Sequence, residues 1–483
     1  MKICRKHFTL FELLISVALL MIIVVVLLRM LALTRDYWHY SNTQSNVYVD
    51  HKVLFDMLED EFSNMVYNYD NAAEEEKFLG ESVCEIFIKT FQYVAPEDYV
   101  DEISIEAKDI ESNVKAGNKT KIQNNFTFCL YATYSNNALY NSDLNPIATW
   151  WADVDFDQFD PLTWLIDETH KRGIEFHAWM NPYRISTLTT DINEAMEKGQ
   201  YLGGKVPSQN PARFAGNLIN GSSGVILNPG LPKVRDFIVE TCMEVVENYD
   251  VDAIHFDDYF YISGVETSKS GDWKRQQVDL FIEDLSNQLR AYNKEHNKAI
   301  QLGISPSGIY RNGGVTSNPK YDANGNLTSP LASNTSGFAH YDNYLYSDTL
   351  KWINEEWIDY IMPQTYWAIE HSAASYGELS RWWSWAVKNK KVNLYLGIGY
   401  YMAESTTGSG AYWQKNKNEI RDQILNAEMY DEIGGVSFYS YNYLNSSNSV
   451  IKTGMTLLKN DYFSKKIPCD IKQYYAPLYD TVP

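Results

Sequence analysis

The chain has 483 residues and a formal net charge of −21 at pH 7, so it is long enough for one large domain with additional segments. An acidic chain repels nucleic-acid phosphates, and no basic patch with interleaved aromatic residues interrupts it, so we expect no nucleic-acid partner. The five cysteines show neither a CxxC pair nor the spacing of a metal site, and no cofactor or metal is expected.

The first predicted element is a hydrophobic helix near the N-terminus. Lys2, Arg5 and Lys6 precede an apolar stretch from Phe8 to Leu33 that is long enough to span a bilayer. The positive-inside rule then leaves the N-terminus in the cytoplasm and the rest of the chain outside, in the periplasm or at the cell surface. A cleaved secretory signal is the alternative, but no Ala-x-Ala site follows the apolar stretch.

Residues 5–33 also resemble the N-terminus of type IV prepilins and pseudopilins, on the segment Lys6-His-Phe-Thr-Leu-Phe-Glu12. In that family a basic leader is cut before a Phe that becomes N-methylated. A Glu four residues further on pairs with the amino terminus of a neighbouring subunit. The resemblance implies a processing site of His7, Phe8 and Glu12, with a prepilin peptidase and pilus or secretion machinery as partners. The chain departs from the family at His7, where Gly is usual.

The chain after this helix divides into a stalk and a large domain. Apolar residues recur at three- and four-residue steps between 54 and 66 and predict an amphipathic helix. That helix is interpreted as a stalk, the alternative being an ordinary helix packed on the next domain. The predicted organisation is a basic leader at 1–7, a membrane helix at 8–33, a helical stalk at 34–80, a barrel at 81–460 and a tail at 461–483.

Strand-like runs alternate with helical patterns through the large domain, which predicts a parallel sheet. Phe126–Tyr131 is interpreted as a seventh strand and Cys84–Tyr93 as an eighth, beside six clearer ones at 174–179, 251–256, 300–305, 357–362, 393–399 and 435–439. Helices are expected at 161–172, 232–248 and 272–296. Eight units would close a TIM-type (β/α)8 barrel, with a degenerate first unit, whereas fewer on a flat sheet would make a doubly wound fold. No GxGxxG or P-loop motif follows a strand, which disfavours nucleotide-binding α/β folds.

Two adjacent carboxylates, Asp257 and Asp258, end the predicted strand 251–256. Alternate strand residues share a face, so His255 and Asp257 are expected to point into the barrel. Glycoside hydrolysis usually needs two carboxyl groups, and Asp257 and Asp258 are the candidate catalytic pair. The alternative is that they cap the next loop or pair with Arg184. Other candidate second carboxylates are Glu370 and Glu404.

The remaining strand ends are also polar or aromatic and supply candidate substrate-binding residues. These are His177, Asn181, Tyr183, Arg184, His255, Ser305, Gln364, Tyr366, Trp367 and Tyr400. Trp367 and Tyr400 are expected to stack on sugar rings. Trp382 and Trp383 lie in a helical pattern and are expected in the core, while Glu175 and Asp359 at strand starts are interpreted as structural.

Residues 125–445 resemble the glycosyl-hydrolase-10-like family of bacterial proteins. Three matching segments are His170-Lys-Arg-Gly-Ile-Glu-Phe-His-Ala-Trp-Met-Asn-Pro-Tyr-Arg184, Ile254-His-Phe-Asp-Asp-Tyr-Phe260 and Asp359-Tyr-Ile-Met-Pro-Gln-Thr-Tyr-Trp367. The resemblance implies a TIM-type barrel that hydrolyses glycosidic bonds, often in bacterial cell-wall glycan. The leading hypothesis is a membrane-anchored glycosidase acting on an extracytoplasmic glycan, such as peptidoglycan. The alternative is a pilin-like structural or glycan-binding protein that displays a barrel without turnover.

Overall fold

The computed structural model describes the strand Cys84–Lys89 and then residues 125–461 with gaps, the longest of which is 314–331. The predicted leader, membrane helix and stalk, and residues 462–483 of the predicted tail, lie outside the described residues. Within the described part, no helix is both long enough and apolar enough to cross a membrane.

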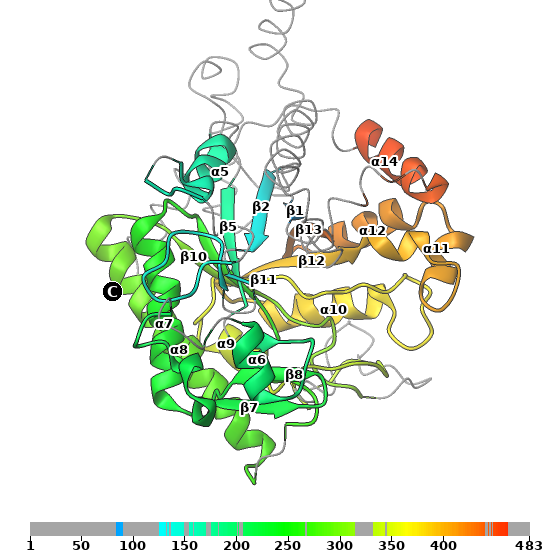
Figure 1. Cartoon of the computed structure of the whole chain (residues 1–483). Helices are drawn as coiled ribbons and strands as arrows, with labels where there is room; N and C mark the ends of the chain where they lie inside the picture. The colour runs from blue at the N-terminus through cyan, green and yellow to red at the C-terminus, as the bar shows by residue number, and fades with distance from the viewer. Residues whose placement is uncertain are drawn as a thin grey trace, which may run out of the picture.

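A curled, largely parallel sheet forms the centre of the molecule (Figure 1). Its strand order is β1-β2-β5-β9-β10-β11-β12-β13. The pairs from β2 to β13 are parallel, whereas β1 pairs antiparallel with β2. The strands are β1 (Cys84–Lys89), β2 (Asn125–Tyr131), β5 (Glu175–Met180), β9 (Ala253–Asp257), β10 (Gln301–Ser305), β11 (Tyr360–Ile361), β12 (Asn393–Gly399) and β13 (Ile433–Tyr439). β1 also lies beside β13, so the two ends of this order meet.

Helices cover the outside of the sheet. α7 and α8 pack against each other on one side, and α10, α12 and α14 lie on the side of β12 and β13 (Figure 1). The helices are α5 (Pro161–His170), α6 (Ile192–Lys198), α7 (Pro232–Asn248), α8 (Gly271–His296), α9 (Thr349–Asn354), α10 (Tyr376–Val387), α11 (Gly410–Lys415), α12 (Glu419–Glu428) and α14 (Ser449–Asp461). Short 3-10 turns are η3 (Pro211–Arg213), η4 (Ala215–Asn217) and η5 (Tyr400–Glu404).

The segment between β5 and α7 builds a small subdomain at the carboxyl end of the strands. A three-stranded antiparallel sheet has the order β6-β8-β7, formed by β6 (Arg184–Ser186), β7 (Leu218–Gly221) and β8 (Gly224–Leu227). It lies with α6 at the end of the molecule opposite α5 (Figure 1). A second small antiparallel pair joins β3 (Thr133–Tyr134) to β4 (Asn137–Ala138).

The local signals in the sequence explain where the main helices begin and end. α7 begins with Pro232 in its first turn, where the missing N–H costs nothing. The Ser270 hydroxyl accepts the Trp273 N–H at the start of α8. α8 ends at Asn297, which adopts the left-handed conformation with a φ of 51°. The predicted range of α7 is confirmed, and the predicted strands at 393–399 and 126–131 match β12 and β2 closely.

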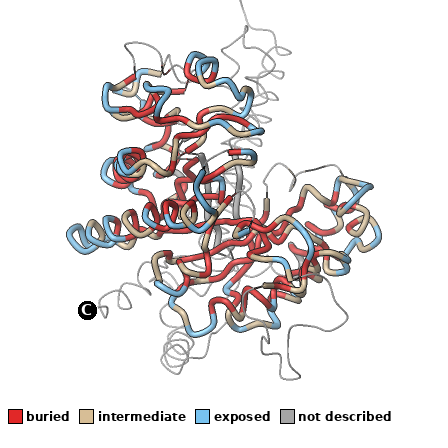
Figure 2. The backbone as a smooth tube through the Cα atoms, turned by 90° about the horizontal axis from the view of Figure 1, so that it is seen from below, coloured by how far each residue is buried: buried red, intermediate tan, exposed pale blue. Residues whose placement is uncertain are grey.

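The hydrophobic core lies between the sheet and these helices. Figure 2 shows buried residues along the central strands and on the inner sides of the helices, with exposed residues outside. Trp382 and Trp383 are fully buried in α10, which confirms their predicted place in the core. Cys242 is likewise buried in α7.

Candidate active site

The two predicted carboxylates lie at the carboxyl end of β9, and both are buried. Asp257 is the last residue of β9, and Asp258 begins the loop that follows. Only 4% of Asp257 and 2% of Asp258 is exposed. In a βα architecture this end of the sheet is where reactive groups gather, because the loops after several parallel strands meet there.

Asp257 is a buried carboxyl with three polar neighbours. Burial raises its pKa to about 6, while the Arg184 guanidinium, the Tyr259 N–H and the Trp179 indole act in the lowering direction. The Tyr259 N–H donates to Oδ1 at 3.1 Å. Arg184 lies over the Tyr259 ring, with its Cζ 4.9 Å from the ring centre. The alternative interpretation was that Asp257 or Asp258 caps the next loop or pairs with Arg184, and Asp257 does accept a backbone N–H of that loop.

Asp258 faces the loop after the neighbouring strand. Its Oδ2 accepts the backbone N–H of Ser307. Burial raises the pKa of Asp258 to about 7, the Ser307 N–H lowers it, and the negative charge of Asp257 raises it further. The two adjacent carboxyls therefore differ: a nearby cation favours ionised Asp257, whereas a nearby anion favours protonated Asp258.

His177 and His255 point into the sheet interior, as their strand positions predict, but neither ring is exposed. Both Nδ1 atoms lie 2.8 Å from the hydroxyl of Tyr360. His177 Nε2 is 3.0 Å from Glu175 Oε2, and His255 Nε2 is 2.9 Å from Ser305 Oγ. The structure thus places the two histidines beneath the candidate site, in contact with other protein side chains.

Ser305 and Gln364 join the ends of β10 and β11. Ser305 is the register partner of Asp257 on the adjacent strand, so the two side chains lie on the same face. Gln364 Nε2 donates to the Ser305 carbonyl at 2.8 Å. Trp367, half-buried, packs against Gly308 in the β10 loop, where a Cβ would meet its ring at 2.8 Å.

Half-buried tyrosines gather at the carboxyl ends of β11, β12 and β13. The predicted residue Tyr366 lies 5.9 Å from Tyr401 and 5.6 Å from Tyr439 between ring centres. Tyr401 also contacts Tyr443 at 6.0 Å. We call Tyr366, Tyr401, Tyr439 and Tyr443 the tyrosine cluster. The sequence prediction included only the first of them.

Two glycines of β12 make room for this cluster. A Cβ at Gly399 would lie 2.8 Å from the Tyr366 side chain, and one at Gly397 would lie 3.1 Å from its ring. The Gly397-Ile-Gly-Tyr-Tyr401 segment therefore carried a signal, since alternating glycines on an inward face indicate a bulky neighbour from the adjacent strand.

Two predicted substrate-binding residues, Tyr183 and Tyr400, lie away from the other candidate residues. Tyr183 is fully buried and packs edge-to-face on Phe260 and Phe281 of α8. Tyr400 is also buried, and its hydroxyl donates to the Ile451 carbonyl in α14 at 2.7 Å. Each ring is already covered on the helix side of the sheet, because the chain has left the regular strand alternation at both positions. Asn181 follows β5 and is buried with only 2% exposed.

The two other candidate carboxylates, Glu370 and Glu404, are exposed. Glu404 Oε1 accepts the Ser446 hydroxyl. Neither side chain has the burial that raises the pKa of Asp257 and Asp258. The pair on β9 is therefore the better candidate for acid–base chemistry.

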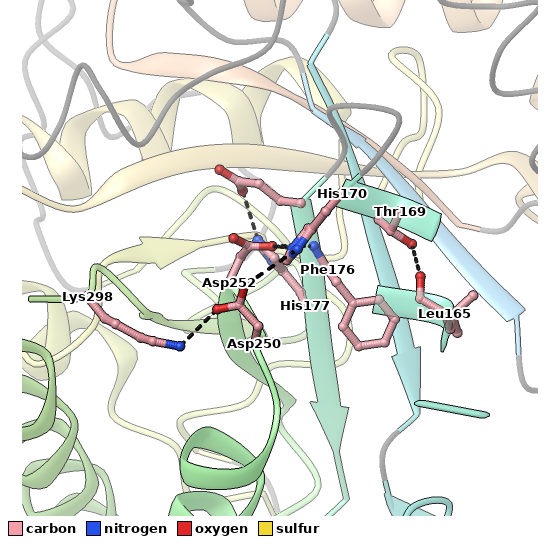
Figure 3. Close-up of polar contacts among 9 residues, drawn as sticks. Leu165, Thr169, His170, Phe176, His177, Asp250, Asp252 and Lys298 are labelled. Carbon is pink, nitrogen blue, oxygen red and sulfur yellow. Dashed lines mark hydrogen bonds and ion pairs between the residues drawn. The ribbon is translucent and has the colours of Figure 1, made fainter. Parts of the chain in front are cut away.

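The opposite end of β9 holds a different set of polar contacts (Figure 3). Asp252 Oδ2 accepts the Phe176 N–H at 2.7 Å and lies 2.7 Å from His170 Nε2. Asp250 contacts Lys298 Nζ at 2.9 Å and His170 Nδ1 at 3.7 Å. Asp359 similarly accepts the Leu302 N–H at 2.7 Å. These contacts tie strand starts together and agree with the structural role predicted for Asp359.

Within the described ranges, no three His, Cys, Asp or Glu side chains converge in a way that would hold a metal ion. The chemistry available at the site is that of two buried carboxyls whose pKa values are raised to about 6 and about 7, a nearby guanidinium and aromatic surfaces. Such a set suits proton transfer to and from a neutral substrate near neutral pH.

Comparisons with known proteins give one family and several relatives. The family model described as Glycosyl hydrolase-like 10 matches residues 100–415. Glycosyl hydrolase YngK of Bacillus subtilis is 35% identical over 326 residues, which cover 64% of this chain and 57% of the relative. Glycosyl hydrolase DigH of Escherichia coli K12 is 32% identical over 309 residues, covering 59% of this chain and 65% of the relative. The chain thus spans less than two thirds of either relative.

Among solved structures, the Group IV chitinase of Ostrinia furnacalis matches with a TM-score of 0.36 and 10% identity, over 68% of this chain and 89% of the chitinase. This similarity is too distant to assign a fold, so the fold is described by the strand order of the chain itself.

Proposed function

This chain belongs to the glycosyl hydrolase-like 10 family, and on that premise we propose that it is a glycoside hydrolase that cleaves an extracytoplasmic glycan by carboxyl acid–base catalysis. The observation that carries the proposal is the pair of adjacent, buried carboxyls at the end of β9, with pKa values raised to about 6 and about 7. We take the curled sheet to be a TIM-type (β/α)8 barrel with an altered first unit. The meeting of β1 with β13 and the antiparallel direction of β1 support this reading.

The two carboxyls take different roles. Asp257, beside Arg184, works in the ionised form as the base or nucleophile. Asp258 keeps its proton to higher pH and works as the general acid that protonates the leaving oxygen. The rate should fall below about pH 6 as Asp257 gains a proton, and above about pH 7 as Asp258 loses one. The two apparent values belong to the coupled pair.

The substrate is a neutral or weakly charged polysaccharide outside the cytoplasm, with peptidoglycan glycan strands as the first candidate. The half-buried tyrosine cluster and Trp367 offer aromatic faces at the carboxyl ends of the strands, and such faces suit the C–H faces of pyranose rings. The net charge of −21 argues against a strongly anionic polymer as substrate.

The test is reducing-end release by the full chain in detergent on a panel of glycans, including intact and peptide-stripped peptidoglycan. Asp257→Asn should abolish turnover while the circular dichroism spectrum stays native. Asp258→Asn should remove the decline in rate above about pH 7 along with most of the activity. Glu404→Gln is the matched control, because this carboxylate is exposed and should leave the rate unchanged.

Absence of turnover on every glycan, together with saturable binding to one of them, would replace this function with that of a glycan-binding module. Full activity in Asp257→Asn would remove the β9 pair from the mechanism.

The site is held at the membrane by the apolar segment 8–33, with the catalytic domain in the periplasm or at the cell surface. The resemblance to prepilins extends this proposal to cleavage before Phe8, methylation of its amine and pairing through Glu12. Mass spectrometry of the N-terminus tests the processing step: a chain that starts at methylated Phe8 supports it, and an intact Met1 contradicts it.

A further inference from the structure

Five side chains form a continuous series of hydrogen bonds through the interior of the sheet, from the start of β5 to the end of β10. They are Glu175, His177, Tyr360, His255 and Ser305, and the four successive distances are 3.0, 2.8, 2.8 and 2.9 Å. We call this set the interior chain. Both histidines are no more than 1% exposed, and Tyr360 is fully buried. None of these contacts joins neighbours along one strand except that of Glu175 with His177.

A glycine makes the central contact possible. Tyr360 at the start of β11 is the register partner of Gly303 on β10, and Gly303 in turn is the partner of His255 on β9. A Cβ at Gly303 would overlap the Tyr360 ring. Because Gly303 has no side chain, the Tyr360 ring lies across β10 and its hydroxyl reaches His255, while its ring stacks on the His255 ring at 14°.

Counting the hydrogens on each group assigns a donor and an acceptor to every hydrogen bond of the interior chain. An ionised Glu175 carboxylate only accepts, so His177 Nε2 carries a hydrogen. Burial favours the neutral imidazole, which leaves His177 Nδ1 as an acceptor for the Tyr360 O–H. The phenol has one hydrogen, so Tyr360 must accept from Nδ1–H of His255. The neutral His255 then accepts at Nε2 from the Ser305 hydroxyl at 2.9 Å, a shorter contact than the 3.4 Å that separates this hydroxyl from the Phe256 carbonyl.

We propose that the interior chain fixes His177 and His255 in opposite tautomers and thereby commits the Ser305 proton to His255, so that Ser305 Oγ faces the candidate site as a hydrogen-bond acceptor. Ser305 is the register partner of Asp257, and Gln364 holds its carbonyl. The next step rests on the proposed function. Ser305 Oγ accepts a hydrogen bond from a hydroxyl group of the bound sugar beside Asp257. His177, His255 and Tyr360 are positioning residues that act through Ser305, in place of the direct substrate contacts predicted for the histidines.

Nitrogen-15 NMR of the full chain, labelled at its nine histidines, tests the tautomers directly. Signals are assigned by their loss in His177→Gln and His255→Gln. The expected result is a neutral ring with hydrogen on Nε2 for His177 and a neutral ring with hydrogen on Nδ1 for His255. The same tautomer in both rings, or a doubly protonated ring at pH 7, would overturn the proposal.

Variants of Glu175 and Tyr360 test whether these hydrogen bonds set the two tautomers. Glu175→Leu removes the accepting carboxylate, so both rings should lose their tautomer preference. Tyr360→Phe should uncouple the rings and lower kcat/KM about tenfold with a native near-ultraviolet circular dichroism spectrum. Unchanged tautomers in Glu175→Leu or in Tyr360→Phe would sink the proposal. A chain without glycosidase activity would end the proposed function, while the NMR result would still decide the tautomers.

Discussion

The two ends of β9 each carry two aspartates, and the surroundings of the two pairs differ. At the start, Asp252 lies against His170 and the Phe176 N–H, and Asp250 against Lys298 (Figure 3). At the end, Asp257 and Asp258 are buried beside each other, and their pKa values rise to about 6 and about 7. The first pair joins strands, whereas burial raises the pKa of both carboxyls in the second. The same residue type thus has different properties according to what surrounds it.

The largest expected effect separates the two ends by activity. Asp257→Asn should lower kcat by about 10³-fold, because the proposed mechanism then lacks one of its two carboxyls. Asp252→Asn, at the other end of the same strand, should leave kcat within about twofold. The measurement is reducing-end release under saturating substrate at a temperature at which both variants are folded. A similar loss in both variants would remove the functional distinction between the ends.

The two ends of β9 should also differ in their effect on stability, in the opposite order. A substitution at the start of β9 should destabilise the protein more than one at its end. Asp252→Ala removes the acceptor of the buried Phe176 N–H and the partner of His170, and should lower the free energy of unfolding by about 3 kcal/mol. Urea denaturation followed by tryptophan fluorescence measures it. Asp257→Asn serves as the comparison and should not be destabilised at pH 7.5, since a neutral amide replaces a buried group that resists ionisation.

The stability of the protein should depend on pH through Asp257, the buried carboxyl at the end of β9. Between the unfolded pKa near 3.9 and the folded value of about 6, the native state binds more protons at Asp257 than the unfolded state does. The free energy of unfolding therefore falls as pH rises through this window, by about 3 kcal/mol for this group. Denaturation at pH 4.5 and pH 7 should show a smaller difference in Asp257→Asn than in the parent. An equal difference would contradict the raised pKa.

The smallest expected effect comes from the exposed ion pair of Lys298 with Asp250, near the start of β9. Lys298→Ala removes the contact with Asp250, whose side chain is 60% exposed. Solvent screens such a pair, so the free energy of unfolding should change by no more than about 0.5 kcal/mol. The same denaturation assay measures it. A loss near that of Asp252→Ala would mean that the whole set of contacts acts as one unit.

The sequence predicted much of the framework because its signals are local. Alternating strand and helix patterns gave the parallel sheet, and the Pro232 start placed α7 at its observed bounds. The two-residue period of β9 also placed His255 and Asp257 on the inner face, where the structure has them. Each of these features depends on residues close together in the chain.

The prediction was weaker where a residue stands just outside a regular strand. Tyr183 and Tyr400 follow polar strand ends, yet both rings are covered by helices, α8 in one case and α14 in the other. Strand alternation no longer applies once the chain turns, so the direction of these side chains depends on the packing of distant segments. The sequence prediction included only Tyr366 of the tyrosine cluster for the same reason, because the members of the cluster come from separate strand ends.

The sequence by itself determined the order of strands and helices, the family and the pair of carboxyls at the end of β9. Only the tertiary structure decided how deep each inward side chain lies, and that Tyr360 crosses over Gly303 to reach two histidines from other strands. Alternation along a strand fixes which face a side chain occupies, but its depth and its partners follow from the stagger between strands and the curl of the sheet. These are properties of all eight strands together.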